Sequence, residues 1–246
     1  MILAITIQKG GAGKTTTAAA LAQAAVHRGL SCLAIDLDPQ RNLSFALAAD
    51  QNAGTSADLL QGVPAADLIR HTDQGVDVIP AGRDLGAVTT SKGSARRLQK
   101  ALAPVTGKYN LIVIDTPGTV GELHYNALMA ADYLIIPIEA DIYNLTSLYQ
   151  TITTARQVQQ MNKRLQLAGI IVTKYDGRSS LSKQMQQGVI DAAAGEGLQH
   201  FGTVRYAVAV KEAAMNGQSL FQYAPKSNPA RDYLQAFDQL RQYLNI

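Results

Sequence analysis

The sequence is poor in the residues that most metal and redox sites require. Among its 246 residues there is one cysteine, Cys32, so a disulfide within the chain is excluded and a cysteine-held iron–sulfur cluster is not expected. Cys32 lies in the apolar run SCLAIDL, where a small buried hydrophobic residue is expected. Four histidines are scattered without the spacing of a metal site and are expected at surface or packing positions: His27, His71, His124 and His200.

Long apolar runs are missing as well. No run approaches the ~18 residues that a membrane-spanning helix needs. The N-terminus, MILAITIQKGG, lacks the basic start and the small-residue cleavage site of a signal peptide, so we expect a cytoplasmic protein. The G-x-S-x-G motif of serine hydrolases does not occur. We find no repeat, low-complexity tract or linker, and expect a single domain over residues 1–246.

Charge is unevenly distributed along the chain. Residues 1–149 contain 11 basic and 13 acidic side chains, whereas residues 150–246 contain 11 basic and 6 acidic ones. A basic C-terminal part is compatible with a polyanionic partner, although a solvated surface would give the same balance.

Apolar, β-branched runs alternate with longer amphipathic segments. Several of the runs, such as LIVID and AGIIVT, are apolar throughout, which is typical of strands buried on both faces of a parallel sheet. The predicted strands are Ile2–Ile7, Cys32–Leu37, Val76–Pro80, Leu111–Asp115, Tyr133–Ile138, Ala168–Thr173 and, more weakly, Phe201–Arg205.

The segments between the strands have helical periodicity. The predicted helices are Thr15–Arg28, Ser94–Ala103, Gly121–Ala131, Leu145–Arg164, Ser182–Ala194, Lys211–Gly217 and Ala230–Leu244. This alternation predicts an α/β fold with a doubly wound, mostly parallel sheet flanked by helices. Ligands of such sheets bind at the carboxyl ends of the strands, which indicates the loops after Ile7, Leu37, Asp115, Ile138 and Thr173.

The first of these loops, ITIQKGGAGKTTT, nearly matches the phosphate-loop pattern G-x-x-x-x-G-K-[ST]. Gly13, Lys14 and Thr15 fit it, but Gln8 replaces the first glycine and Lys9 adds a charge. Glycines let the backbone amides approach phosphate oxygens at the positive end of a helix. Lys14 is expected to reach the outer phosphates and the Thr15 hydroxyl to ligate Mg²⁺.

Two further motifs place carboxylates at strand ends. In LAIDLDPQRN, Asp36 and Asp38 are two residues apart and are expected to share a face. Beside a bound magnesium nucleotide, one carboxylate can orient the waters of the metal and the other an attacking water. In YNLIVIDTPG, Asp115 ends a strand and is suited to hold Mg²⁺ through water. Together the three motifs predict a Mg²⁺-dependent nucleoside triphosphatase, and no other catalytic set competes with them.

The same residues resemble a known family. KGGAGKTT, IDLDPQRN and LIVIDTPG are similar to the motifs of the ParA/MinD group of deviant phosphate-loop ATPases. The later blocks NALMAADYLIIPIEADIYNLTSL, GIIVTKYDGRSSLS and VRYAVAVKEAAMNGQSLFQYAPKSNPARDYL resemble Soj-type ParA partition proteins. The resemblance covers nearly the whole chain and is weakest over residues 50–105.

The resemblance implies an ATP-sandwich homodimer in which Lys9 of one subunit reaches the phosphates bound by the other. Such a lysine can act like an arginine finger supplied in trans. It further implies that Lys9, Lys14 and Asp38 are catalytic, that Asp38 positions the attacking water, and that Thr15, Asp36 and Asp115 serve Mg²⁺. The implied ATP-binding residues are Lys9, Gly10, Gly11, Ala12, Gly13, Lys14, Thr15 and Thr16.

Three features depart from the family pattern. Related proteins usually have a second proline where this chain has Gly118, which loosens that turn. They often have Arg-Gly where this chain has Asn228 and Pro229, which removes one DNA-contacting arginine. The phosphate loop begins within ten residues of Met1, so the N-terminal helix-turn-helix extension of larger plasmid members is not expected.

The family's partners are non-specific DNA and a ParB-like protein that stimulates a weak ATPase, so nucleoid association is expected. Lysine and arginine contacts to phosphates suffice for such DNA binding, which weakens with salt. Our candidate DNA contacts are Arg178, Lys183, Arg205, Lys211, Lys226 and Arg231.

Two alternatives remain open. A MinD-like ATPase acting at a membrane or on a protein assembly needs an amphipathic C-terminal helix with a basic face. The tail ARDYLQAFDQLRQYLNI has an apolar face formed by Tyr233, Leu234, Phe237, Leu240, Tyr243 and Leu244, but its charges are mixed. We therefore expect this helix to pack on the domain and expect no stable membrane insertion. A metabolic phosphate-loop kinase or ligase would need a polar substrate pocket, which the sequence does not indicate.

Overall fold

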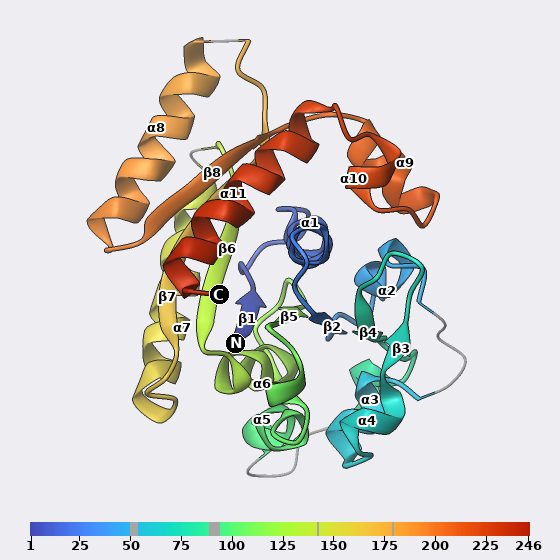
Figure 1. Ribbon diagram of the computed structural model, residues 1–246. Helices are drawn as coiled ribbons and strands as arrows, with labels where there is room; N and C mark the ends of the chain where they lie inside the picture. The colour runs from blue at the N-terminus through green and yellow to red at the C-terminus, as the bar shows by residue number, and fades with distance from the viewer. Residues whose placement is uncertain (50–53, 89–93, 142, 179) are drawn as a thin grey trace.

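The strands of the protein assemble into one twisted sheet. The computed structural model describes residues 1–49, 54–88, 94–141, 143–178 and 180–246. In these residues eight strands pair in the order β3-β4-β2-β5-β1-β6-β7-β8 (Figure 1), with β3 and β4 antiparallel and every other pair parallel. Their bounds are β1 Ile2–Ile5, β2 Cys32–Asp36, β3 Arg70–His71, β4 Asp77–Ile79, β5 Leu111–Asp115, β6 Tyr133–Glu139, β7 Gln166–Tyr175 and β8 Gln199–Arg205. The predicted doubly wound, mostly parallel sheet is confirmed.

All seven predicted strands are present, and their ends agree with the prediction within two residues. Strand β3 was not predicted. It has two polar residues, Arg70 and His71, which are too few for the apolar pattern by which a strand is recognised.

Helices connect the strands. Their bounds are α1 Lys14–His27, α2 Asn42–Ala46, α3 Ser56–Gln61, α4 Ala65–Leu68, α5 Arg97–Leu102, α6 Glu122–Ala130, α7 Asn144–Met161, α8 Ser180–Gly195, α9 Ala209–Met215, α10 Leu220–Tyr223 and α11 Asn228–Leu244. The predicted helix Ser94–Ala103 is divided into a 3₁₀ turn, Ser94–Arg96, and α5. The sequence did not predict α2, α3, α4 and α10, because four to six residues do not show helical periodicity.

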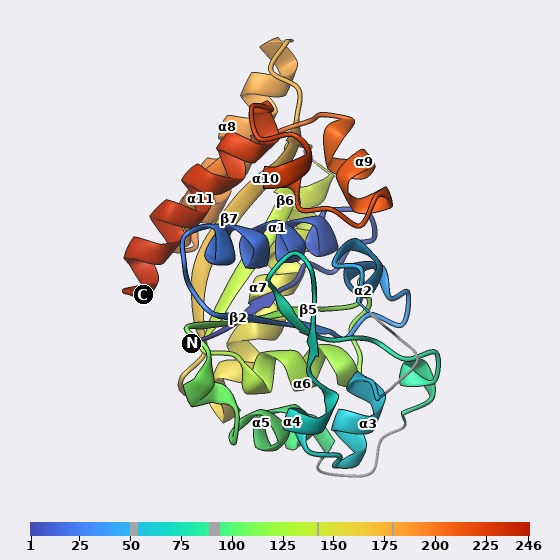
Figure 2. The same ribbon diagram turned by 45° about the vertical axis from the view of Figure 1, so that its right-hand side comes forward.

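The sheet is covered on both faces. Along β1, Leu3 and Ile5 join the core under α1 and α11, whereas Ile2 and Ala4 join the core under the helices α3 to α8. Successive side chains of a strand point to opposite faces, so a strand buried on both faces must be apolar at every position. Figure 2 shows α1 on one side of β2 and β5 and α6 on the other.

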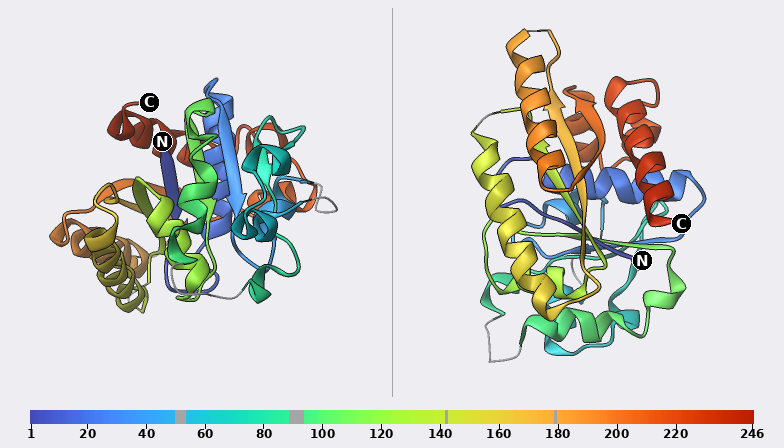
Figure 3. Two further views of the ribbon diagram at one scale, coloured as in Figure 1. Left: turned by 90° about the horizontal axis from the view of Figure 1, so that it is seen from below. Right: turned by 90° about the vertical axis from the view of Figure 1, so that its left-hand side faces the viewer.

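The C-terminal helix packs on the domain as expected. Helix α11 and helix α8 lie on opposite sides of β8 (Figure 3). Tyr233, Phe237, Leu240 and Leu244 of α11 are buried in the core shared with α1. Tyr243, which is 37% exposed, packs edge-on against Phe201. The apolar face of α11 is therefore covered by the domain, and in the described chain no helix has the length and apolar character to cross a membrane.

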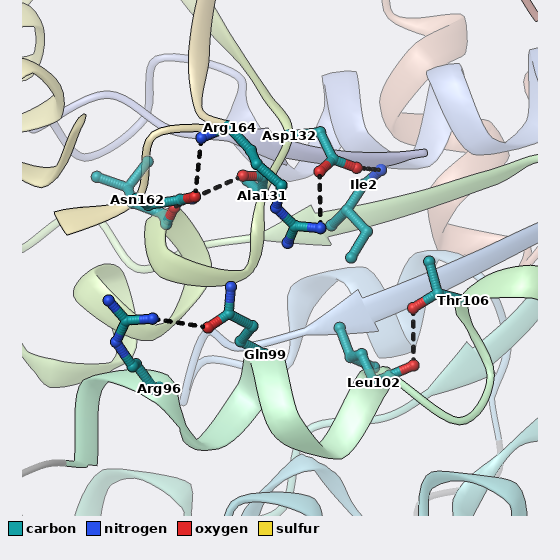
Figure 4. A network of polar contacts seen from close by, with 10 residues as sticks. Ile2, Arg96, Gln99, Leu102, Thr106, Ala131, Asp132, Asn162 and Arg164 are labelled. Carbon is teal, nitrogen blue, oxygen red and sulfur yellow. Dashed lines mark hydrogen bonds and ion pairs between the residues drawn. The ribbon is translucent and has the colours of Figure 1, made fainter. Parts of the chain in front are cut away.

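A polar network closes the edge of the sheet where β1 begins (Figure 4). The carboxylate of Asp132 accepts a hydrogen bond from the Ile2 amide at 2.9 Å and faces the guanidinium of Arg164 at 3.8 Å. The side-chain amide of Asn162 donates to the carbonyl of Ala131 at 2.9 Å. These contacts join β1, the end of α6 and the turn before β7. A cleft lies at the opposite edge of the sheet, where the parallel strands end.

Candidate nucleotide-binding site

The carboxyl ends of β1, β2 and β5 meet at one edge of the sheet. Ile5 and Asp36 both pair with Asp115 in the strand register, so the loops that follow them are neighbours. These loops surround a cleft of about 770 Å³, a size usual for small-molecule sites. It is lined by Gly10, Gly11, Gly13, Lys14, Thr15, Thr16, Asp38, Pro39, Gln40, Asn42, Leu85, Gly86, Val88, Pro117, Gly118, Thr119, Gly121, Glu122, Leu123, Lys174 and Lys211.

The phosphate-loop sequence forms a tight loop between β1 and α1. Gly11 (φ 76°) and Gly13 (φ 85°) adopt the left-handed conformation that favours glycine. A Cβ on Gly13 would also lie 3.4 Å from the Thr173 hydroxyl. Helix α1 begins at Lys14 with no acidic residue in its first turn, so its positive end is available to an anion. The loop therefore has the backbone shape that phosphate binding requires.

Lys14 is the buried cation of the cleft. Its side chain is held against the loop by a hydrogen bond from Nζ to the Lys9 carbonyl at 2.6 Å, and the residue is 6% exposed. Burial lowers the pKa of Lys14, while the charges of Asp115 and Asp38 raise it. A cation with so little water around it interacts strongly with an incoming phosphate.

Asp115 has a free oxygen in a buried place. Its Oδ1 accepts a hydrogen bond from the Thr116 amide at 3.1 Å, and its Oδ2 has no partner among the described residues. Burial raises the pKa of Asp115 well above its usual range, and the charge of Asp36 raises it further. The Thr15 hydroxyl lowers this pKa. An unpartnered buried carboxylate oxygen needs an explanation, and a bound cation beside Thr15 supplies one.

The donor set fits Mg²⁺ rather than a metal held by the protein alone. Within the described ranges, no group of three or more His, Cys, Asp or Glu side chains could hold a metal. Mg²⁺ usually takes one or two protein ligands and completes its shell with water and substrate phosphates. Thr15 and Asp115 match that pattern.

Asp36 and Asp38 differ in exposure: Asp36 is fully buried, whereas Asp38 lines the cleft. Strand β2 ends at Asp36, so the alternation of side chains between the two faces of a strand does not extend to Asp38. Asp36 is fully buried, and its oxygens accept hydrogen bonds from the Asp38 amide (3.0 Å) and from the amide and hydroxyl of Ser44 (2.8 and 2.7 Å). Burial raises the pKa of Asp36 to about 6, and the bonds from Ser44 oppose the rise. Asp36 thus shapes the loop that carries Asp38 onto the cleft, and its role toward Mg²⁺ stays a prediction.

Lys9 takes a different direction from Lys14. Its Nζ donates to the Oδ1 of Asn144, at the start of α7, and the side chain is absent from the cleft lining given above for the described residues. The Asn144 amide in turn donates to the carbonyl of Glu139 at 3.1 Å. Gly118 allows a close approach here, because a Cβ on it would lie 3.3 Å from the Lys9 carbonyl oxygen.

Several lining residues were not predicted. Glu122 starts α6 and faces the cleft behind the 117–121 turn, and Lys174 lies one residue beyond the predicted strand Ala168–Thr173. The rule that ligands bind at the carboxyl ends of strands had already indicated the loop after Thr173. That rule was the signal by which Lys174 could have been found.

Two of the six candidate DNA contacts form ion pairs within the described chain. Arg178 forms hydrogen bonds with both oxygens of Asp176, and Arg205 is bound to both oxygens of Asp232. Because Asp232 is nearly buried, the Arg205 pair ties β8 to α11. These two arginines are less suited to phosphate contacts than the sequence suggested.

The other four candidates differ in position. Lys211 lines the nucleotide cleft, and Arg231 donates to the Asn228 side chain at 3.0 Å. Lys183 and Lys226 are exposed and form no ion pair with any residue that the structure describes.

A parallel sheet with a glycine-rich loop between β1 and α1, a buried lysine at the helix start and an aspartate at the end of β5 defines a phosphate-loop nucleotide-binding protein. Residues 1–167 match the family model of an AAA domain. The chromosome-partitioning ATPase Soj of Thermus thermophilus is 37% identical over 234 residues, which cover 94% of this chain and 91% of Soj. The chromosome partitioning protein ParA of Caulobacter vibrioides is 37% identical over 250 residues, with 95% and 91% covered. The chain belongs to the ParA/Soj family of partition ATPases.

Solved structures share the fold of this chain. An ATP complex of a Cyanothece McdA variant has a TM-score of 0.85 at 25% identity and covers 100% of this chain and 96% of that one. Pyrococcus horikoshii MinD with Mg-ADP has a TM-score of 0.82 at 25% identity, covering 99% and 96%. Cobyrinic acid a,c-diamide synthase of Mycobacterium smegmatis with an ATP analog and magnesium has a TM-score of 0.81 at 28% identity, covering 99% and 95%.

Proposed function

We propose that this chain is an ATP-switched partition ATPase that is active as a two-fold dimer on DNA. Mg²⁺ and ATP occupy the cleft of about 770 Å³, with the phosphates on the loop amides and Lys14. Thr15 and Asp115 would hold the metal, and the bound metal would neutralise developing phosphate charge. Support for this site comes from the unpartnered Asp115 oxygen and from the nucleotides present in the similar structures.

We propose the dimer because the side chains of Lys9 and Lys14 point in different directions. Lys14 is buried in its own cleft, whereas the half-buried side chain of Lys9 is directed away from that cleft, to Asn144. A lysine at this position can reach the phosphates of a second subunit that approaches this face, and two-fold symmetry supplies the contact twice. ATP then favours the dimer, because the dimer makes more contacts with it than the monomer does.

Hydrolysis requires a group that orients water at the outer phosphate. Asp38 lies on the cleft, and its Oδ1 accepts a hydrogen bond from the Gln40 amide at 2.9 Å, which orients the carboxylate. We assign Asp38 this task. Loss of the outer phosphate removes the group that Lys9 of the second subunit contacts, and the dimer separates.

DNA and a stimulating protein complete the cycle. Non-specific binding to phosphates needs only exposed cations, and Lys183 and Lys226 are the free candidates on the described surface. A ParB-like partner stimulates the weak ATPase and releases the protein from nucleoid DNA. Support for this last part of the proposal comes from the resemblance of the chain to the ParA family and from its similarity to the chromosome-partitioning proteins Soj and ParA.

The variant Lys9→Ala tests the dimer. We expect it to bind ATP, because Lys14 and the loop amides remain, but to stay a monomer in size-exclusion chromatography with light scattering. Lys163→Ala is the matched control, since Lys163 is exposed on the turn before β7, at the far end of the sheet. If Lys9→Ala dimerises with ATP as the wild type does, the trans role of Lys9 is wrong.

The variant Asp38→Ala tests the hydrolytic step. Removing a group that positions water should lower the rate of ATP hydrolysis about 100-fold or more. ATP binding should persist, so the variant should accumulate as an ATP-bound dimer on DNA. Retention on random-sequence DNA, followed over time after ATP addition, measures this. If Asp38→Ala releases phosphate at the wild-type rate, another residue orients the attacking water.

Two measurements on the wild-type protein distinguish the alternatives, a MinD-like ATPase and a metabolic kinase or ligase, from a partition ATPase. Co-sedimentation with anionic vesicles in ATP, without retention on random-sequence DNA, would favour a MinD-like activity. ATP turnover that depends on a metabolite rather than on DNA or a partner peptide would favour a ligase or kinase. We expect retention on DNA and neither of the other results.

A further inference from the structure

The end of β7 has an unusual backbone beside the phosphate loop. Lys174 adopts a left-handed conformation (φ 52°), which costs about 1–2 kcal/mol in a residue other than glycine. The pairing of β7 with β8 shifts between Val172 and Tyr175, around the same residue. Irregularities of this kind redirect a side chain and are common next to active sites. At this position the redirected side chain is a lysine that lines the nucleotide cleft.

Two successive side chains of β7 hold two successive carbonyls of the phosphate loop. Lys174 Nζ donates to the carbonyl of Gly11 at 2.5 Å, and the buried Thr173 hydroxyl donates to the carbonyl of Ala12 at 3.1 Å. The carboxylate of Glu139, at the end of β6, anchors the ammonium of Lys174 at 2.6 Å. Glu139 thus limits the freedom of a long side chain that is otherwise partly exposed.

These contacts determine where the loop amides point. In a planar trans peptide the C=O and N–H bonds are antiparallel. Holding the carbonyls of Gly11 and Ala12 toward β7 therefore turns the amides of Ala12 and Gly13 the other way. Neither amide donates a hydrogen bond to any residue that the structure describes. Unpaired backbone donors at the start of α1 are the groups that bind phosphate.

We propose that Lys174, anchored by Glu139, is a positioning residue of the nucleotide site that pre-orients the loop amides for the phosphates. The proposal rests on the proposed function, because it assumes that the cleft binds a nucleoside phosphate. Lys174 acts mainly on affinity, since the amides bind the phosphates of ATP and ADP alike. Its removal should therefore change KM far more than kcat.

The experiment compares Lys174→Met with Lys163→Met. Met keeps the length of the side chain but cannot donate, and Lys163 is an exposed lysine before the other end of β7. Displacement of a fluorescent nucleotide gives Kd for ADP and ATP, and phosphate release gives KM and kcat. For Lys174→Met we expect Kd and KM to rise about tenfold, equivalent to about 1.4 kcal/mol. The change in kcat should stay under about threefold, and Lys163→Met should match the wild type.

Rescue separates positioning from a general structural role. Lys174→Arg keeps a charged donor within reach of the Gly11 carbonyl and should recover Kd to within about threefold of the wild type. Thr173→Val, which removes the neighbouring donor at nearly constant volume, should also weaken binding. The inference is overturned if Lys174→Met binds nucleotide within twofold of the wild type, or if Lys174→Arg is no better than Lys174→Met. If the wild type itself binds no nucleotide, the proposed function fails instead.

Discussion

At the scale of single residues, burial controls the charged groups of the site. Lys14, at the start of α1, and Asp115, at the end of β5, have little or no contact with solvent, so each group is less stable in its charged form than in water. Their opposite charges partly compensate one another. A bound magnesium nucleotide would satisfy both groups at once, because it offers phosphates to the lysine and a cation to the carboxylate.

His124 is a second buried polar residue near the phosphate loop. Its Nδ1 lies 3.2 Å from the hydroxyl of Thr6, and its Nε2 has no partner in the described chain. Burial, and to a smaller extent the charge of Lys14, lowers the pKa of His124 to about 4. The sequence predicted a surface or packing histidine, and the structure buries it.

The lowered pKa of His124 predicts a pH dependence of folding. An unfolded histidine binds its proton near pH 6.5, whereas the folded one binds it near pH 4, so the unfolded state holds more protons in between. This contribution to the free energy of unfolding is complete above pH 6.5 and is lost as the pH falls toward 4. In the variant His124→Gln the free energy of unfolding should depend less on pH, as measured by urea unfolding between pH 4.5 and 7.5.

Gln235→Ala is the control for this measurement, since Gln235 is exposed and has no titratable group. It should keep the wild-type dependence on pH. A His124→Gln protein with an unchanged slope would show that other groups cause the dependence.

At the scale of elements, α11 completes one face of the sheet. Phe237 is fully buried between α1 and β8, and the bidentate pair of Arg205 with Asp232 fixes the start of the helix on β8. Most of the apolar face of this helix is thereby used in packing on the domain. The mixed charges of the sequence already favoured this packing.

Phe237→Ala should lower the free energy of unfolding by about 3–5 kcal/mol, the usual cost of truncating a buried phenylalanine. Gln235→Ala, at an exposed position of the same helix, should change it by less than about 0.5 kcal/mol. Chemical unfolding of the two variants measures the difference. A small effect of Phe237→Ala would mean that α11 contributes little to the core.

At the scale of the whole molecule, the basic character of the second half is partly neutralised in the fold. Arg178 and Arg205 are paired with carboxylates, whereas Lys183 and Lys226 are free among the described residues. Charge counts along a sequence do not reveal such pairing.

The double variant Lys183→Ala/Lys226→Ala should weaken retention on random-sequence DNA with ATP at every sequence tested. Each lost phosphate contact should reduce the slope of log affinity against log salt by about 0.9. Arg178→Ala, which removes a paired cation, should leave the slope close to that of the wild type. DNA titrations at several salt concentrations measure these slopes. Equal slopes for the wild type, the double variant and Arg178→Ala would show that Lys183 and Lys226 do not contact DNA.

Local sequence by itself determined the class of fold and the phosphate loop. Apolar strands of five or six residues, with helical periodicity between them, suffice to predict a parallel sheet. Gly13, Lys14 and Thr15 mark the loop. Both signals are carried by neighbouring residues. The short elements between residues 42 and 71 could not be predicted, since their stability comes from packing rather than from local pattern.

The tertiary structure alone decided how the groups of the site are arranged. It buried Asp36 and left Asp38 on the cleft, with a hydrogen bond from the Asp38 amide to Asp36 where β2 ends. It directed Lys9 to Asn144, and brought Lys174 to the Gly11 carbonyl across 163 residues of sequence. Contacts over such separations depend on the register of the sheet and on the packing around it, and local sequence carries neither.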